Sequence, residues 1–390
     1  MKKVVFVVQR YGLEVNGGAE LQCRLFAEKL KDVFDITVLT TCAIDYLSWK
    51  NEYEKGEEVI NGVKVIRFPV DSERNIRKFN ELNEIVFNFV EDKSLGEKWM
   101  KEQGPFSSKL LDYIEGNQGN YDFFVFFTYL YATTYFSLPL ITESKKFLVP
   151  EAHDERPIYL KIFDDVFNQV DGLIYNTEEE KSFVDSRFDL RGKPNVIGGM
   201  GVELPNKMIN VEDFKRKYGV DDYVLYVGRV DGSKGCGELF NNFLKYRDEF
   251  DSKTKLVVMG KPVMDIPKNE SIISLGFVSE EDKFAGIMGS KFVINPSQYE
   301  SLSIILLETF LCKKMILVNG LSEVLKGHCL KSNGGLWYEN EDDFLEAFNL
   351  LENDCLLREK LAVNGYEYVT NNYRWELVTS RIVGFLNGEL

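Results

Sequence analysis

The chain has 390 residues, with 47 lysines and arginines against 62 aspartates and glutamates, and its formal net charge is −15. This length suits two domains of ordinary size. The acidic balance argues against nucleic acid as a partner and against a basic face for anionic lipid. The six cysteines follow no spacing typical of a metal site or a disulfide framework, so we expect reduced thiols in an intracellular protein.

The N-terminus predicts a buried strand rather than a signal peptide. Lys2 and Lys3 precede only a short apolar run, and a polar loop follows without a small-residue cleavage site. The segment Asn16–Glu20 (N-G-G-A-E) then leads into a predicted helix. We therefore expect a cytoplasmic protein. A peripheral position at the inner face of the membrane also fits this expectation.

Strand-like apolar runs alternate with helical patterns along the whole chain. The first set of predicted strands is Val4–Val8, Ile36–Thr40, Val63–Phe68, Phe123–Phe127, Lys146–Val149 and Leu173–Asn176. The second set is Val224–Val227, Lys255–Met259, Ile272–Phe277, Phe292–Asn295 and Ile316–Val318. Short buried strands separated by helices predict parallel sheets covered on both faces, which is an α/β fold. Two such sets predict two domains, with a boundary near Gly198–Lys207, where glycines and a proline interrupt both patterns.

Two segments of the first half need separate interpretation. Residues 71–118 predict a helical insertion with helices at Asn75–Asp92 and Ser107–Tyr113, and either an acceptor-shaping or a simple packing role is open. Residues 123–142 carry no charge and could be mistaken for a membrane span. The threonines, tyrosines and proline of this segment favour a strand at Asp122–Thr128 and a buried helix after it, so we expect no transmembrane segment.

The stretch N-P-S-Q-Y-E-S-L-S-I-I-L-L-E-T-F places Glu300 just before a predicted helix and Glu308 inside it, with Ser301 or Ser303 available as the cap. Eight helical positions correspond to about 12 Å along the axis. This separation suits two hydroxyl-rich groups at opposite ends of a diphosphate, with the helix N-terminus aimed at the phosphates. The pattern indicates a nucleotide-sugar site.

A basic turn lies some seventy residues upstream. In Y-V-L-Y-V-G-R-V-D-G-S-K-G, an apolar run ends at Gly228, and Arg229 and Lys234 follow in a turn that enters a helix. Cations at this position can neutralise a diphosphate leaving group. As isolated residues, both would be interpreted as ordinary solvated turn residues.

These two motifs together resemble the donor-site signature of glycosyltransferase family 4. The resemblance implies the GT-B fold, in which two Rossmann-like doubly wound parallel-sheet domains face a cleft, and it implies a retaining transferase. It extends to Tyr373–Trp375 ahead of a last helix. The implied domains are an acceptor-binding domain at 1–200, a donor-binding domain at 201–372, and a C-terminal helix at 373–390 that packs back on the first domain.

The resemblance also implies roles for individual residues in binding a UDP- or GDP-sugar. Arg229 and Lys234 would stabilise the diphosphate, Glu308 would bond the ribose hydroxyls, and Glu300 would bond sugar hydroxyls remote from the anomeric carbon. Further expected donor-binding residues are Gly17, Gly18, Gly276, Phe277, Val278, Ser301, Leu302 and Ser303. Many family members carry Gly-Phe-Gly where this chain has Ser-Leu-Ser at 301–303, and the serines still offer backbone N–H groups to phosphate.

The first domain supplies His153, in P-E-A-H-D-E after an apolar strand. In the family, a histidine here lies near the anomeric carbon, so His153 joins Arg229, Lys234 and Glu300 as an expected catalytic residue. A core histidine that bonds a backbone carbonyl is the alternative. Asp154 would orient the ring or contact the acceptor, and Glu20 is a second expected acceptor contact. The other histidine, His328, has no comparable setting and is expected to be structural.

No Asp-x-Asp sequence occurs, so the usual carboxylate clamp for a divalent metal is missing. We therefore expect no metal and no other cofactor, and transfer by front-face attack on the anomeric carbon. The expected partners are the nucleotide-sugar donor and a glycan or lipid-linked glycan acceptor of cell-surface polysaccharide assembly. The alternatives are a GT-B sugar-nucleotide epimerase and a catalytically silent nucleotide-sugar-binding partner protein.

Overall fold

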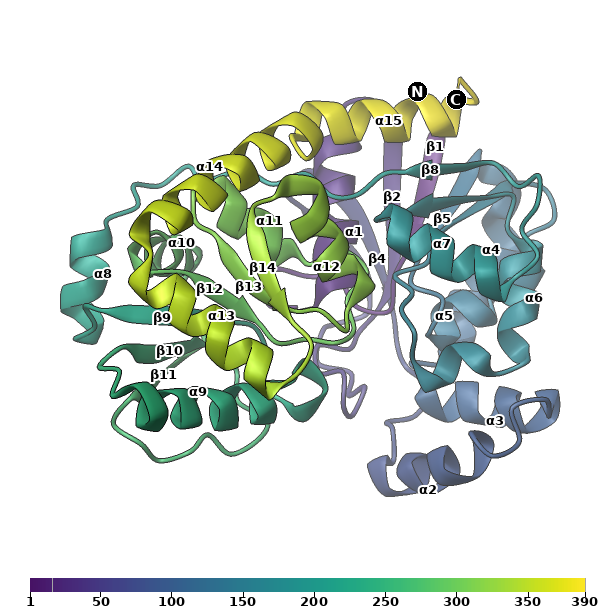
Figure 1. Cartoon of the computed structure of the whole chain (residues 1–390). Coiled ribbons are helices and arrows are strands. Elements are labelled where there is room, and N and C mark those ends of the chain that lie inside the picture. Colours follow the sequence, from purple (N-terminus) through teal and green to yellow (C-terminus); the bar gives the residue numbers. More distant parts are fainter. Residues whose placement is uncertain (16, 390) are drawn as a thin grey trace. The chain divides into compact units, whose positions relative to one another are not determined.

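A computed structural model describes residues 1–15 and 17–389, and the chain divides into two compact units (Figure 1). Unit 1 comprises Met1–Met200 with Thr379–Leu390, and unit 2 comprises Gly201–Val378. The predicted boundary segment contains this division. The last helix, α15 (Trp375–Asn387), begins in unit 2, and its second half packs in unit 1, where Phe385 and Phe147 have ring centroids 5.4 Å apart. The return to unit 1 therefore starts at Thr379 rather than at 373.

Unit 1 contains, in its described residues, an eight-stranded sheet of order β3-β4-β2-β1-β5-β6-β7-β8. The pairs are parallel except for β3 with β4. The strands are β1 (Lys3–Val7), β2 (Asp35–Thr41), β3 (Gly56–Ile60), β4 (Val63–Phe68), β5 (Phe123–Phe127), β6 (Lys145–Val149), β7 (Gly172–Tyr175) and β8 (Asn195–Ile197). The helices are α1 (Gly18–Leu30), α2 (Ile76–Val86), α3 (Lys93–Gln103), α4 (Ser108–Asn117), α5 (Ala132–Tyr135), α6 (Ile162–Gln169) and α7 (Glu178–Arg187).

Unit 2, all of whose residues are described, contains a parallel six-stranded sheet of order β11-β10-β9-β12-β13-β14. Renumbered within the unit, this is the 3-2-1-4-5-6 order of doubly wound nucleotide-binding sheets. The strands are β9 (Tyr223–Val227), β10 (Lys255–Met259), β11 (Ile272–Gly276), β12 (Val293–Asn295), β13 (Ile316–Asn319) and β14 (Gly335–Tyr338). The helices are α8 (Val211–Tyr218), α9 (Cys236–Phe250), α10 (Glu280–Gly289), α11 (Ile304–Leu311), α12 (Glu323–Ser332), α13 (Glu341–Asn353) and α14 (Cys355–Asn372).

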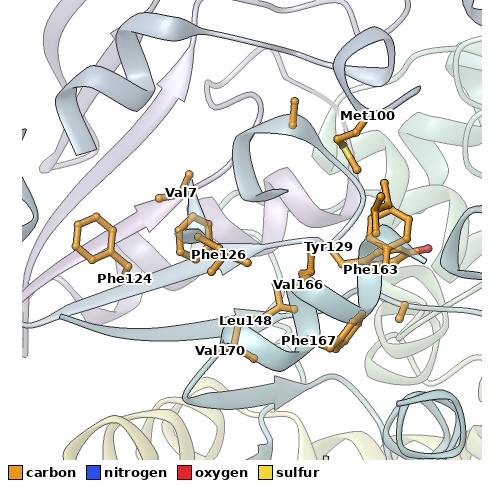
Figure 2. Close-up of a cluster of buried hydrophobic side chains, with 14 of the residues drawn as sticks. Val7, Met100, Phe124, Phe126, Tyr129, Leu148, Phe163, Val166, Phe167 and Val170 are labelled. Carbon is orange, nitrogen blue, oxygen red and sulfur yellow. The ribbon is translucent and has the colours of Figure 1, made fainter. Parts of the chain in front are cut away.

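The core of unit 1 is rich in aromatic side chains that come from β5 and from helix α6 (Figure 2). Phe124 and Phe126 are fully buried, and Tyr129 packs edge-on against Phe163 with ring centroids 4.7 Å apart. Burying a side chain of this size stabilises the fold by about 1.5–3 kcal/mol. The apolar composition of residues 123–142 therefore reflects a central strand of a buried sheet.

The buried helix expected after this strand is α5, which has four residues. α5 ends at Tyr135, and Pro139 follows in a 3₁₀ turn at Leu138–Leu140. The residue before a proline disfavours the helical conformation, which explains the early end. Within the described residues, no helix is both long and apolar enough to cross a membrane.

The insertion at 71–118 differs from its prediction because it contains three helices. The first ends at Val86 instead of Asp92, and the side chain of Asp92 caps α3 by accepting a hydrogen bond from the Leu95 N–H at 3.0 Å. α3 covers the whole K-W-M-K-E-Q segment that the prediction left between helices, and it buries Trp99. A capping aspartate and one buried aromatic residue are enough to define this helix.

Candidate functional site

The carboxyl ends of β9 and β12 meet at the centre of the unit 2 sheet. β10 and β11 continue the sheet on one side of this pair, and β13 and β14 continue it on the other. In sheets of this order, ligands bind outside the carboxyl ends of the strands where the winding direction reverses. A basic turn (residues 228–235) follows β9, and an acidic turn (residues 296–303) follows β12. Both predicted donor motifs therefore lie at the same end of the sheet.

The basic turn is organised by the carboxylate of Asp231. It accepts hydrogen bonds from the Lys234 N–H at 3.0 Å and the Ser233 hydroxyl at 2.6 Å, and it pairs with the Arg229 guanidinium. Burial alone would raise the pKa of Asp231, but the Ser233 hydroxyl and Arg229 outweigh it and lower that pKa below its usual value. The carboxylate thus stays ionised and holds Arg229 at the sheet end.

The basic and acidic turns touch through their backbones at Gly235. This residue has φ of 72°, and a Cβ added to it would lie 2.3 Å from the carbonyl oxygen of Pro296. Only glycine fits such a close approach with a left-handed backbone. The glycine of the sequence motif therefore fixes the distance between the two turns.

An ion pair joins the two turns through their side chains. The Lys234 Nζ lies 2.8 Å from Glu300 Oε1, and these side chains are 33% and 17% exposed. Sequence reasoning assigned these residues to different parts of a donor, and the structure places them in direct contact. Because both remain partly exposed, their charges are accessible to a ligand.

Helix α11 begins where a cap at Ser303 would place it, but Glu300 lies outside the helix, so the axial rise of about 12 Å expected between Glu300 and Glu308 does not apply. The helix starts at Ile304, and Glu300 belongs to the acidic turn. Ser303 occupies the N-cap position with φ of 67° and ψ of 81°, and its side chain makes no capping hydrogen bond. Its hydroxyl instead accepts a hydrogen bond from Asn295 Nδ2 at 3.0 Å. The cap prediction fails because a left-handed serine directs its side chain away from the first turn.

Glu308 has a lysine partner that the sequence did not indicate. The Lys283 Nζ, from helix α10, lies 2.6 Å from Glu308 Oε1, and these side chains are 22% and 11% exposed. Each glutamate of the motif is thus paired with a lysine from another element.

The other expected donor residues of this unit lie at the neighbouring strand end. Gly276 closes β11 with φ of 66°, and its carbonyl accepts a hydrogen bond from the Gly260 N–H at 2.8 Å. Phe277 follows and is 72% exposed. An exposed aromatic ring next to a glycine can stack on a flat ligand.

His153 lies in unit 1, in the loop that follows β6. Its Nδ1 is 3.6 Å from Glu155 Oε1, and Glu155 also accepts a hydrogen bond from the Tyr129 hydroxyl at 3.1 Å. Asp154, which we expected to orient the ring, accepts from the Tyr159 hydroxyl at 2.7 Å. The carboxylate beside the histidine is therefore that of Glu155, two positions along the chain.

This loop is held by a buried carboxylate that sequence reasoning missed. Glu180, in the first turn of α7, accepts hydrogen bonds from the N–H groups of Ala152 at 2.7 Å and Asn176 at 2.6 Å. Burial raises the pKa of Glu180 to about 8, although these backbone donors act in the opposite direction. Glu180 joins the ends of β6 and β7 and so fixes the backbone beside His153.

The glycine segment after β1 surrounds a second buried charge. Glu20 is 5% exposed and forms an ion pair of 2.6 Å with Arg10, and it also accepts a hydrogen bond from Gln9 at 2.8 Å. A Cβ on Gly17 would lie 1.9 Å from Glu20 Oε2, whereas Gly18 has open space. Asn16 lies outside the described residues. Glu20, expected as an acceptor contact, is thus committed to Arg10 within unit 1.

The expected site residues therefore form two groups. One contains Arg229, Lys234, Glu300 and Glu308 with residues 276–278 and 301–303 of unit 2, and the other contains His153, Asp154 and residues 17–20 of unit 1. Across residues 1–15 and 17–389, no group of three or more His, Cys, Asp or Glu side chains is arranged to hold a metal ion. The unit 2 group offers cations for phosphate oxygens and carboxylates for hydroxyl groups at one sheet end.

Comparison with known families agrees with this geometry. Residues 210–368 match the family model for glycosyl transferases group 1. The matched residues lie within unit 2. An uncharacterized glycosyltransferase of Methanocaldococcus jannaschii is 25% identical over 188 residues, which are 44% of this chain and 47% of that protein. The chain thus matches about half the length of this curated relative.

Solved structures share the fold of the whole chain. HepE of Anabaena, crystallised with UDP and glucose, aligns over 100% of both chains with a TM-score of 0.73 and 13% identity. Sucrose-phosphate synthase of Thermosynechococcus elongatus aligns over 100% of this chain and 99% of its own with a TM-score of 0.70 and 14% identity. The chain has the GT-B fold, with one doubly wound α/β sheet in each unit.

Proposed function

We propose that the protein is a glycosyltransferase that moves a sugar from a UDP- or GDP-sugar to a glycan acceptor. The observation that supports this most directly is the Lys234–Glu300 pair, which joins a basic and an acidic turn where the unit 2 sheet reverses its winding. In this proposal, the pair supplies a cation for phosphate beside a carboxylate for sugar hydroxyls. The group 1 family match and the UDP complex of HepE support the donor class, with UDP as the first base to test.

In this proposal, the unit 2 residues divide the donor between them. Arg229 and Lys234 stabilise the charge that develops on the departing diphosphate, with help from the N–H groups at the start of α11. Glu300 accepts hydrogen bonds from the sugar hydroxyls and Glu308 from the ribose. The exposed ring of Phe277, with Gly276 and Val278, stacks against the base. No metal ion takes part, because these cations occupy the role that a metal would otherwise have.

We infer that transfer proceeds with retention of the anomeric configuration, by attack from the face that the diphosphate leaves. The bond between the anomeric carbon and the diphosphate oxygen breaks, the acceptor oxygen bonds to the same face, and the acceptor proton passes to the departing phosphate. His153 contacts the donor sugar in this scheme, with Glu155 beside its Nδ1 at 3.6 Å. The resemblance to family 4 supports retention and the use of a growing cell-surface glycan as acceptor. That acceptor is free or lipid-linked at the inner face of the membrane, and the enzyme is cytoplasmic or peripheral there.

The test is turnover of UDP-glucose and GDP-mannose with a panel of sugar acceptors, with and without EDTA. We expect release of one nucleoside diphosphate, unchanged by EDTA, and a product whose anomeric proton shows the configuration of the donor. An inverted product would contradict front-face attack, and loss of activity with EDTA would contradict metal independence. Conversion of the donor sugar without transfer would identify an epimerase, and tight donor binding without any turnover would identify a silent binding protein.

A further inference from the structure

The acidic turn of unit 2 adopts a strained backbone at Ser303. A residue with a Cβ at φ of 67° is strained and persists only where its surroundings enforce it. Glycine would adopt this conformation without cost. The sequence has serine here, so other groups of the chain must hold the turn.

Two side chains hold this turn from different elements. Asn295, at the end of β12, donates a hydrogen bond to the Ser303 hydroxyl at 3.0 Å. His328, from helix α12, lies with its Nε2 at 3.0 Å from the carbonyl oxygen of Leu302. The first contact fixes the side chain of Ser303, and the second fixes the peptide group that precedes it.

The chemistry of the partners determines the tautomer of His328. A carbonyl oxygen only accepts, so Nε2 carries the hydrogen, and Nδ1 accepts from the Tyr368 hydroxyl at 3.0 Å. His328 is 1% exposed, and burial lowers its pKa to about 3. The ring therefore stays neutral, and its donor to Leu302 is present throughout the physiological pH range.

The direction of this hydrogen bond has a consequence for the next N–H group. In a trans peptide, the C=O of Leu302 and the N–H of Ser303 lie in one plane and point in opposite directions. Because the carbonyl points at a buried ring of α12, the Ser303 N–H points away from it. It precedes the N–H groups of Ile304 and Ile305, which have no partner within the helix because they open α11.

We propose that His328 is a positioning residue for diphosphate binding, which orients the Ser303 N–H by holding the Leu302 carbonyl. This rests on the proposed donor function of the same turn. His328 touches no donor atom in this account, and its hydrogen bond to Leu302 helps to hold a left-handed backbone that glycine would adopt without strain. The serine at 303 and the histidine at 328 are thus two parts of one arrangement.

The experiment compares UDP with uridine, or GDP with guanosine if the wild type selects guanine, by calorimetric titration. The dissociation constant of the nucleoside divided by that of the diphosphate isolates the contribution of the phosphates to binding. His328→Gln keeps an N–H donor near the Nε2 position, whereas His328→Asn places its amide near Nδ1 and His328→Leu has no donor. We expect the ratio to fall about tenfold in the Asn and Leu variants, as for one lost hydrogen bond to a charged group, and to stay within about twofold in the Gln variant.

Tyr246→Phe is the matched control for a general loss of stability. Its hydroxyl donates to Glu352 at 2.6 Å in another buried network of unit 2. This variant should melt earlier than wild type and keep the wild-type ratio. If the Leu variant does not fold, the ratios of the Gln and Asn variants are enough to test the role of His328.

The outcomes separate this inference from the proposed function. If the wild-type protein binds neither diphosphate more tightly than its nucleoside, the proposed donor function is wrong. Wild-type preference with an unchanged ratio in the Asn and Leu variants would overturn the role of His328 alone. Equal losses in the Gln and Asn variants would also overturn it, because the donor at Nε2 would then be irrelevant.

Discussion

The two units use charged residues in different ways at the carboxyl ends of their sheets. In unit 2, the pairs Lys234–Glu300 and Lys283–Glu308 join side chains of separate elements, and all four side chains retain some exposure. In unit 1, Glu20 and Glu180 are almost completely buried and bind an arginine and backbone N–H groups, respectively. Partly exposed pairs can exchange partners with a ligand, whereas buried ones maintain the shape of the backbone. The difference supports the proposal that donor binding belongs to unit 2 and loop positioning to unit 1.

The largest effect should follow from removing the cation of the basic turn. Lys234→Ala should lower the rate of transfer by about 10²–10³-fold, because it removes charge stabilisation from the departing diphosphate. Steady-state kinetics should show this loss while the melting temperature changes little, since the Lys234 side chain is partly exposed. Lys245→Ala, which removes the surface pair with Glu341, is the control with wild-type activity. Full activity in Lys234→Ala would contradict the proposal that unit 2 carries the donor chemistry.

The two glutamates of unit 2 should differ in what they bind. Glu308→Ala should weaken the binding of free UDP or GDP about tenfold, as for a lost charged hydrogen bond to ribose. Glu300→Ala should affect free nucleotide less and intact donor more, since its partner is the sugar. Titration of both variants with nucleotide and with donor measures this ranking, and the reverse order would mean that the ribose is misplaced.

The carboxyl group of Glu180 should show its role through the pH dependence of stability. Its folded pKa of about 8 exceeds its unfolded value, so the native state binds an extra proton between these values. The stability that it contributes is therefore complete in acid and is lost as pH rises through 8. Glu180→Gln cannot ionise, so wild type should lose melting temperature relative to this variant between pH 5 and pH 8.5. A constant difference across this range would contradict the raised pKa.

The sequence predicts the longer apolar strands and misses β3, β8 and β14. β3 (G-E-E-V-I) is an exposed antiparallel edge strand, and its charged residues give no buried run. β8 has three residues, and β14 begins with a glycine, so neither forms a recognisable pattern. These strands exist because a neighbouring strand offers backbone hydrogen bonds, which depends on tertiary structure rather than on local composition.

The candidate site was predictable where chemistry and spacing coincide in one segment. Arg229, Lys234 and Glu300 stand in turns that follow apolar strands, and Glu308 lies in helix α11 after the second turn. The sheet brings these segments together. Lys283 follows three acidic residues on an amphipathic helix, and His328 stands in an unremarkable helical segment. Their partners, Glu308 and the Leu302 carbonyl, become neighbours only through the packing of α10, α11 and α12. No local pattern records such contacts.

The most direct test of a donor site in unit 2 is the thermal stability of the wild-type protein with UDP, GDP, ADP and CMP, each with and without EDTA. A ligand at 100 times its dissociation constant adds about 2.7 kcal/mol of stability, which raises the melting temperature measurably. We predict stabilisation by UDP or GDP that EDTA leaves unchanged. Stabilisation by none of the four nucleotides, or one that disappears with EDTA, would contradict a metal-independent nucleoside diphosphate site built on Arg229, Lys234 and Glu308.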